Sequence, residues 1–307
     1  MLKTNLQRVL DMGHFAVTTE IGPPKSADPL AISTKASLLQ GYADAFNVTD
    51  NQTAVVRMSS MAGSCILKQC ELEPVLQMTC RDRNRLALQA DVLGASALGI
   101  HNMLFVTGDH QSKGNHPQAK GVFDIDSVQL LSIVRNMRDK GIFQNSEPLS
   151  STAPNVFIGA VANPFISKIT LRIDRLEKKI NAGAQFIQTQ SVFNISRFEQ
   201  YMDAIRERDL HKNVHIIAGV TPLKSIKMLE RMKYHVPGVD IPDDIAKRLA
   251  YSDDVEREAL DITKELIEKI KSIRGVHGIH ITALFWEQKI PQIVKATGLF
   301  PRPFIKL

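Results

Sequence analysis

Eight short apolar segments recur along the 307-residue chain, and each is followed by a stretch with the spacing of an amphipathic helix. This alternation is typical of parallel βα units. Eight such units in one chain of this length fit a closed (β/α)8 barrel (TIM barrel) of the α/β class better than an open sheet. An open sheet usually carries a GxGxxG turn after its first strand, and none is present here. The expected strands cover residues 15–20, 44–49, 75–80, 102–108, 156–162, 185–190, 215–220 and 278–284.

The chain after the seventh expected strand is longer than one βα unit needs. Residues 225–236 have a helical pattern, and the densely charged stretch 237–275 predicts further helices with a solvated face. The content of 44% hydrophobic and 23% charged residues is ordinary for a globular protein. We therefore expect a single (β/α)8 catalytic domain over residues 1–307, with extra helices after strand seven.

Composition argues against several classes of protein. The N-terminal residues lack an apolar run of signal-peptide length, and the chain has no apolar run long enough to span a membrane, which predicts a cytoplasmic protein without membrane insertion. The net charge of +6 comes from dispersed Lys and Arg, which suits anionic small molecules better than nucleic acid. Three cysteines without a CxxC pair, and nine dispersed histidines, predict that this chain alone binds no metal or iron–sulfur cluster.

Polar residues stand at the carboxyl ends of all eight expected strands. In a (β/α)8 barrel these ends surround one pocket, where the chemistry gathers. Glu20 and Asp109 are acidic and follow strongly apolar strands, so partial desolvation would raise the carboxyl pKa and allow general acid catalysis. Alternatively, each carboxylate caps its loop or pairs with a lysine. The polar set is Glu20, Thr49, Asp50, Asn51, Gln77, Thr79, Thr107, Gly108, Asp109, Asn163, Gln190, Thr221 and Thr282.

A group of three arginines precedes an expected helix. Arg81, Arg83 and Arg85 in CRDRNR lie where the helix dipole disfavours positive charge, so an anion nearby would offset that cost. The candidates are a phosphate, a substrate carboxylate, or the protein's own Asp50 and Asp82.

A second cationic group lies in the stretch 172–184. There Arg175, Lys178 and Lys179 share one helix face, which is most often simply solvated. The polar, glycine-containing loop 110–121 follows Asp109 and could be a mobile lid over the pocket.

Six motifs occur in an order that resembles the methylenetetrahydrofolate reductase family, with similarity over about residues 12–300. The resemblance implies a (β/α)8 barrel that holds a flavin, with FAD preferred and FMN as the alternative. The implied reaction is the reduction of 5,10-methylenetetrahydrofolate to 5-methyltetrahydrofolate. The motifs are TTEIGPP (18–24), NVTDN (47–51), QMTCRDRNR (77–85), FVTGDH (105–110), RLEKKINAGAQFIQTQ (175–190) and IAGVTPL (217–223).

The resemblance also implies roles for individual residues. Glu20 matches the acid that protonates the folate N10, and Asp109 matches the aspartate beside flavin and pterin that stabilises the cationic iminium. Gln190 and Leu284 match substrate contacts, and the lysines suit the phosphates of the flavin. The implied cofactor-binding set is Thr49, Asp50, Gln77, Thr107, Gly108, Asp109, Asn163, Arg175, Lys178 and Lys179.

The sequence departs from the family pattern at several positions. Trp286 stands near the place of a folate-binding arginine, and Gln77 and Asn163 replace histidines of bacterial members. These changes put folate-tail binding and nicotinamide docking in question more than the flavin chemistry.

The CRDRNR and VTDN motifs resemble the branch of acetogenic anaerobic bacteria, whose one-carbon metabolism is the Wood–Ljungdahl pathway. There the subunit often pairs with a small iron–sulfur protein. The electrons are therefore expected from NAD(P)H or from such a partner subunit, within an oligomer or hetero-complex. The alternatives are a non-redox pterin- or folate-binding methyl-transfer barrel and a folate reductase that needs no flavin.

Overall fold

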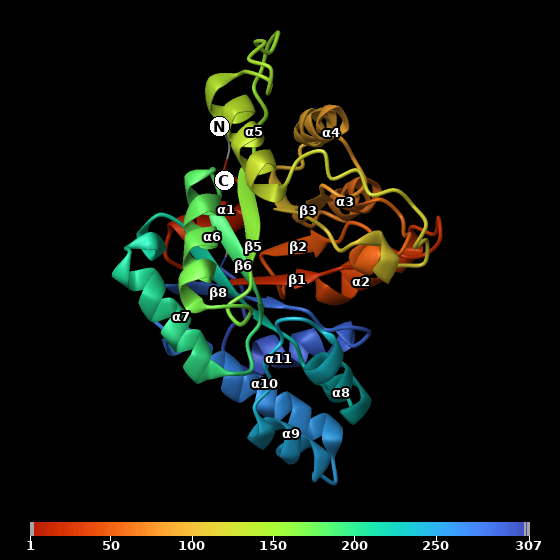
Figure 1. Cartoon of the computed structure of the whole chain (residues 1–307). Coiled ribbons are helices and arrows are strands. Elements are labelled where there is room, and N and C mark those ends of the chain that lie inside the picture. Colours follow the sequence, from red (N-terminus) through yellow and green to blue (C-terminus); the bar gives the residue numbers. More distant parts are fainter. Residues whose placement is uncertain (1–2, 304, 306–307) are drawn as a thin grey trace.

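Eight parallel strands close into a barrel in the order of the sequence, and β8 pairs back with β1 (Figure 1). The structure is a computed structural model that describes residues 3–303 and 305, so the outermost residues of the expected domain lie outside the described part. The predicted (β/α)8 barrel is confirmed, with each strand within a few residues of its expected position. The strands are β1 (Ala16–Glu20), β2 (Ala45–Val48), β3 (Pro74–Thr79), β4 (Asn102–Val106), β5 (Phe157–Ala162), β6 (Phe186–Ser191), β7 (His215–Val220) and β8 (Val276–Ile281).

Helices surround this barrel and connect successive strands (Figure 1). Three of them, α8, α9 and α10, lie between β7 and β8, which confirms the extra helices predicted after strand seven. None of the helices in the described chain is long and apolar enough to cross a membrane. Their bounds are α1 (Asn5–Asp11), α2 (Leu30–Leu39), α3 (Ser60–Gln69), α4 (Arg85–Ala97), α5 (Ser127–Lys140), α6 (Ile169–Asn181), α7 (Ile195–Glu207), α8 (Ile226–His235), α9 (Asp243–Ala250), α10 (Val255–Ser272) and α11 (Ile290–Ala296).

Short 3₁₀ helices lie in four of the connections. They are η1 (Gln52–Ala54), η2 (Gln111–Lys113), η3 (Leu210–Lys212) and η4 (Glu287–Lys289). Two of them belong to the long loops after β2 and β4, at the carboxyl end of the barrel. These loops carry several of the predicted site residues.

The barrel interior is apolar at its amino-terminal end and polar toward the carboxyl ends of the strands. The apolar layer receives Leu6, Val9 and Leu10 of α1, so this helix closes the amino-terminal end of the barrel. The opposite end, where the carboxyl ends of the strands meet, holds a cleft. The strand residues of the apolar layer are Ala16, Ala45, Val75, Leu104, Phe157, Phe186 and Ile217.

Helix caps fix the loops that border the open end. The side chain of Asn84 accepts a hydrogen bond from the Ala87 amide and begins α4. Asp126 and Gln129 form a capping box at the start of α5, which holds the end of the long β4–α5 loop. The sequence-predicted helix start after CRDRNR is therefore correct.

Candidate active site

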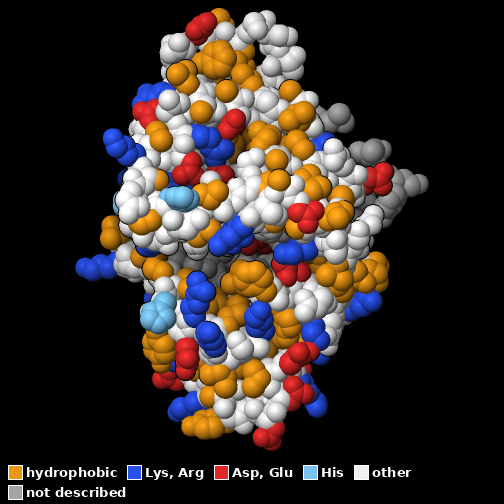
Figure 2. Space-filling view, turned by 90° about the vertical axis from the view of Figure 1, so that its right-hand side faces the viewer, with side chains coloured by type: hydrophobic (Ala, Val, Ile, Leu, Met, Phe, Trp, Pro, Cys, Tyr) orange, Lys and Arg blue, Asp and Glu red, His pale blue; other side chains and the backbone are white. Residues whose placement is uncertain are grey.

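A cleft of about 570 Å³ opens at the carboxyl ends of the strands. This end faces right in Figure 1, where the β4–α5 loop lies. Figure 2 views the molecule from that side and shows a hollow across the surface, with Lys and Arg side chains along its edges. The pocket expected from the strand ends is therefore present. Of the predicted site residues, those that line it are Gln77, Thr107, Gly108, Asp109, Asn163, Arg175, Lys179 and Gln190.

Glu20 ends β1, and its side chain is largely buried beside the cleft. The pKa of this carboxyl is raised from 4.5 to about 7, chiefly by burial and also by the charge of Glu287, against the lowering effects of Gln52, Lys35 and Arg57. Gln52 lines the cleft and donates a hydrogen bond from Nε2 to Oε1 of Glu20 at 3.4 Å. A large fraction of Glu20 is therefore protonated near neutral pH, as a general acid requires.

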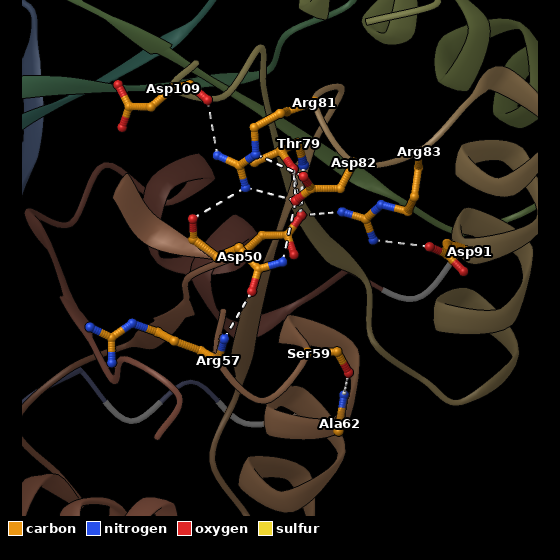
Figure 3. Close-up of polar contacts among 11 residues, drawn as sticks. Asp50, Arg57, Ser59, Ala62, Thr79, Arg81, Asp82, Arg83, Asp91 and Asp109 are labelled. Carbon is orange, nitrogen blue, oxygen red and sulfur yellow. Dashed lines mark hydrogen bonds and ion pairs between the residues drawn. The ribbon is translucent and has the colours of Figure 1, made fainter. Parts of the chain in front are cut away.

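Asp109 lines the cleft but differs from Glu20 in its surroundings. Its side chain is 48% exposed, so this carboxylate is about half in solvent. Lys113 Nζ lies 3.9 Å from Oδ1. The main-chain oxygen accepts a hydrogen bond from Arg81 at 3.2 Å, while the carboxylate points away from that arginine (Figure 3). The β4–α5 loop thus directs an accessible negative charge into the cleft.

Gly108 occupies a position whose backbone conformation and close neighbours favour glycine. Its φ of +91° is a conformation that L residues rarely adopt. A Cβ there would also lie 3.1 Å from Cβ of Arg81 and 3.2 Å from Cβ of Thr79. The tight approach of the β4 loop to the β3 loop therefore depends on this glycine, and Thr107 and Asp109 are positioned by it.

The arginines of CRDRNR pair with carboxylates of the chain itself, and Figure 3 shows the pairs of Arg81 and Arg83. The sequence left a phosphate and a substrate carboxylate open as partners, but the protein supplies its own anions. The two proposed internal partners, Asp82 and Asp50, are both used. The pairs are Arg81 with Asp82 at 2.7 Å, Arg83 with Asp50 and with Asp91 at 3.0 Å, and Arg85 with Asp124 at 2.7 Å.

Asp50 and Thr49 lie at the end of β2 and are buried. Oδ2 of Asp50 accepts hydrogen bonds from the Thr79 amide and hydroxyl, each at 2.9 Å, as well as the ion pair with Arg83. This carboxylate is occupied in joining β2 to β3, and it does not line the cleft. Thr49 Oγ1, by contrast, is buried without a hydrogen-bond partner among the described residues. The cofactor roles of both remain predictions.

One wall of the cleft is formed by α6. Arg175 and Lys179 line it as predicted, together with Arg172, which sequence reasoning did not select. Lys178 is exposed and does not line the cleft. Lys179 Nζ donates to the Val161 carbonyl at 2.6 Å, and burial, with the charge of Arg175, lowers its pKa to about 8. The cations facing the cleft therefore stand at i, i+3 and i+7 of the helix.

A polar network at the floor of the cleft was also missed from the sequence. Gln188 of β6 and Asn47 of β2 exchange two amide hydrogen bonds across the barrel, at 2.6 and 3.1 Å. Gln188 also donates to Thr18, whose hydroxyl lies 2.9 Å from Nδ1 of His280. Burial lowers the pKa of His280 to about 4, so this ring is neutral near pH 7. Gln188 and His280 line the cleft. Side chains alternate along a strand, and this alternation places both residues on the face that points into the barrel. It was the signal in the sequence that could have found them.

The remaining predicted residues differ in their access to the cleft. Gln77, Asn163 and Gln190 line it, at the ends of β3, β5 and β6. Leu284 does not line the cleft; it is 37% exposed in the loop after β8. Trp286, two residues further on, is buried. The structure therefore brings the three amides together, and the substrate contact of Leu284 remains a prediction.

The fold and the cleft define a (β/α)8 barrel with an acid beside a pocket and a cationic wall. A family profile described as methylenetetrahydrofolate reductase matches residues 5–298. The chain belongs to the methylenetetrahydrofolate reductase family, as the motifs indicated.

Curated relatives agree with this assignment. Methylenetetrahydrofolate reductase 2 of Schizosaccharomyces pombe is 28% identical over 241 residues, which cover 74% of this chain and 36% of that protein. The probable methylenetetrahydrofolate reductase (NADPH) of Caenorhabditis elegans is 22% identical over 312 residues, covering 98% of this chain and 45% of that protein. The chain thus spans less than half the length of either relative.

Solved structures share the fold at low sequence identity. An uncharacterized protein from Clostridium thermocellum, which binds two copies of 5-methyl-5,6,7,8-tetrahydrofolic acid, matches with a TM-score of 0.68 at 17% identity, covering 95% of this chain and 97% of that chain. A riboflavin lyase with modified FMN matches with a TM-score of 0.54 at 8% identity, covering 93% and 92% of the two chains.

Proposed function

We propose that this chain, acting as one catalytic domain, reduces 5,10-methylenetetrahydrofolate to 5-methyltetrahydrofolate with a bound flavin. The observation that carries the proposal is Glu20, a carboxyl with a pKa of about 7 that contacts the cleft through Gln52. Membership of the family and the folate bound by the Clostridium thermocellum protein support the substrate class.

The residues of the cleft fit a flavin. Arg172, Arg175 and Lys179 present positive charge on one wall, which suits the phosphates of FAD or FMN. Between Thr107 and Asp109, Gly108 lines the cleft without a side chain. When bound, the flavin supplies the hydride. The expected preference for FAD over FMN is part of the proposal and has a direct test in cofactor identification.

Residues of the chain itself would donate the proton to the substrate and stabilise the positive charge that develops on it. Protonated Glu20 gives its proton to the folate N10, which opens the five-membered ring and leaves a cationic iminium on the substrate. The accessible carboxylate of Asp109 offsets that positive charge, and Gln190 hydrogen-bonds the pterin. The two carboxylates can play opposite roles because one is largely buried and the other is exposed.

The electron donor is proposed to be NAD(P)H or an iron–sulfur partner subunit in a cytoplasmic complex. The Caenorhabditis elegans relative is described as NADPH-dependent, which supports the first source. Anaerobic stopped-flow mixing of the isolated chain with NADH and with NADPH separates the two sources. Rapid bleaching of the flavin by either nucleotide removes the need for a partner.

The substitution Glu20→Gln tests the proposed acid. Reduced enzyme is mixed anaerobically with 5,10-methylenetetrahydrofolate, and reoxidation of the flavin is followed, so that the result does not depend on the physiological donor. We expect a loss of about 10²-fold or more, because general acid catalysis contributes about that factor. Flavin content should be unchanged.

The matched control is Glu230→Gln, an exposed glutamate of α8, which should react like the wild type. Near-normal reoxidation of the Glu20→Gln enzyme would refute the role of Glu20. A purified chain without flavin absorbance, yet able to bind the folate, would instead support a non-redox folate-binding barrel or a flavin-independent reductase.

A further inference from the structure

Gln52 is the one residue of the described chain whose side chain hydrogen-bonds Glu20. Its Nε2 atom donates to Oε1 of Glu20 at 3.4 Å, and the same side chain lines the cleft. The second carboxyl oxygen, Oε2, has no hydrogen-bond partner among the described residues. An amide N–H pairs with the carbonyl oxygen of a carboxylic acid, so the proton belongs on Oε2. Glu20 is thus held by one oxygen and can donate from the other.

Three charged side chains also face Glu20, and each of them is engaged elsewhere. Glu287 of η4 forms an ion pair with Lys35 of α2, so these two charges largely offset each other. Arg57, in the loop after η1, donates to a main-chain carbonyl at 3.2 Å. The three charges act on Glu20 through space, whereas Gln52 makes the direct contact. The orientation of the carboxyl group therefore depends on Gln52.

Gln52 begins η1, in a loop whose backbone conformation is unfavourable for its residues. Asn51, Thr53 and Ala54 have positive φ values, of 44°, 56° and 58°. None of them is glycine, so this conformation costs free energy that the surrounding contacts must offset. Backbone strain of this kind is concentrated at functional sites. The loop therefore depends on its contacts to present Gln52 to Glu20.

Arg81 of the CRDRNR motif supplies the central contact of this loop. Its Nη2 atom donates to the Asn51 carbonyl, and its Nη1 atom donates to the Asp109 carbonyl, each at 3.2 Å. Asp82 fixes the guanidinium by accepting two hydrogen bonds, at 2.8 and 2.7 Å (Figure 3). The side chain of Asn51 in turn donates to Asp82 at 3.2 Å. One buried guanidinium therefore joins the loop after β2 to the loop after β4.

We propose that Gln52 is the positioning residue of the proposed acid, held against Glu20 by Arg81 through Asn51. This inference rests on the proposed function, because a positioned acid needs a substrate to protonate. The Gln52 amide leaves Oε2 as the donor oxygen, and it stabilises the carboxylate that remains after the proton has moved to the folate N10. The CRDRNR motif thus supports the acid without contacting it.

Titration of Glu20 in the variant Gln52→Met tests this contact without any turnover. Methionine has a similar length but no N–H group, so the carboxylate loses its hydrogen bond. Difference infrared spectra between pH 5 and 9 follow the C=O band of the protonated acid, which is assigned by its loss in Glu20→Gln. We expect the titration to move up by about one pH unit, the effect of losing one hydrogen bond to a charged group. Flavin reoxidation by 5,10-methylenetetrahydrofolate at pH 7 should slow about 10-fold.

Two further variants separate the contact from its support. Asn51→Ala keeps Gln52 but removes the hydrogen bonds of the Asn51 side chain with Asp82 and with the Arg57 amide. Alanine also adopts positive φ less readily than asparagine, so we expect a smaller shift in the same direction. The matched control is Gln200→Met, an exposed glutamine of α7, which should leave the titration unchanged. Circular dichroism of each variant confirms that it is folded.

The outcomes separate this inference from the proposed function. An unchanged titration in Gln52→Met, or an equal shift in Gln200→Met, overturns the positioning role even if the chain reduces the folate. A shift in Gln52→Met but none in Asn51→Ala supports the contact and overturns its support by Arg81. If the titration shifts as expected but reduced wild type is not reoxidised by the folate, Gln52 still positions Glu20 and the proposed reaction fails.

Discussion

At the scale of the residue, two chemically similar carboxylates differ in burial because of their positions in the fold. Glu20 and Asp109 both follow apolar strands, and the sequence suggested partial burial for each. In the structure Glu20 is largely buried and its pKa rises to about 7, whereas 48% of the Asp109 side chain is exposed. Loop length explains the contrast: Glu20 is still part of β1, but Asp109 lies three residues beyond the end of β4.

The raised pKa of Glu20 predicts a pH-dependent stability. Folded Glu20 holds its proton up to about pH 7 but would lose it near 4.5 when unfolded, so the folded state binds more protons between these values. Stability should therefore fall as pH rises from 4.5 to 7 and level off above. The penalty from this group reaches about 3 kcal/mol at high pH.

Urea denaturation at pH 5 and pH 8.5 measures this effect. Glu20→Gln should be nearly neutral at pH 5 but more stable than the wild type at pH 8.5, because the amide carries no charge to desolvate. Glu230→Gln, an exposed glutamate, should show no such difference. Equal effects of Glu20→Gln at both pH values would show that the carboxyl titrates normally.

At the scale of the element, α6 shows why a helix face cannot be assigned from spacing alone. The positions i, i+3 and i+4 identify Arg175, Lys178 and Lys179 as neighbours, but not which side of the helix meets the cleft. In the structure, the face of α6 that meets the cleft carries Arg172, Arg175 and Lys179. Ile173 and Leu176 of α6 are buried in the core and fix that rotation.

The β4–α5 loop is attached to its neighbours at several points. Amides of Val122 and Phe123 donate to the carbonyls of Arg81 and Cys80, at 2.7 and 3.2 Å. Oδ1 of Asn115 accepts from the Val56 amide at 3.0 Å, which joins this loop to the loop after β2. The mobile lid expected from the sequence remains a prediction, and these contacts are what its opening would have to break.

Gly114 provides a test of this attachment. A Cβ there would lie 1.7 Å from the Ala54 carbonyl oxygen, so Gly114→Ala must separate the two loops. We expect faster hydrogen exchange in residues 107–123 and a loss of about 1–3 kcal/mol of stability. Gly94→Ala in α4 is the control, since nothing lies within 4 Å of its added Cβ. That change should stabilise the helix by about 0.5–1 kcal/mol, and unchanged exchange in Gly114→Ala would contradict loop attachment.

At the scale of the whole molecule, α1 closes one end of the barrel and leaves the other for the ligand. Leu6 of α1 is fully buried against the apolar interior layer. Leu6→Ala should therefore cost about 2–5 kcal/mol of unfolding free energy, measured by chemical denaturation. The control Leu30→Ala removes a leucine that is 66% exposed and should change stability by less than about 0.5 kcal/mol. A similar cost for both would mean that α1 does not close the barrel.

The sequence predicted the eight-stranded barrel, the helices after β7, the start of α4 and the pocket at the strand ends. These features depend on the local alternation of apolar and polar residues, which is written directly in the chain. It also selected Glu20 as the candidate acid at the end of the first strand, and that role remains a prediction. The family motifs added the family, which is confirmed, and the expected reaction, flavin and residue roles, which remain proposals.

Only the tertiary structure decided how distant side chains meet. Asn47 of β2 and Gln188 of β6 hydrogen-bond across the barrel. Asp50 accepts a hydrogen bond from Thr79 and forms an ion pair with Arg83. Such pairings depend on barrel closure and on the rotation of each helix, which are set by packing between segments far apart in sequence. Local patterns therefore determined which elements form and where the cleft opens. The three-dimensional packing determined which cations face it.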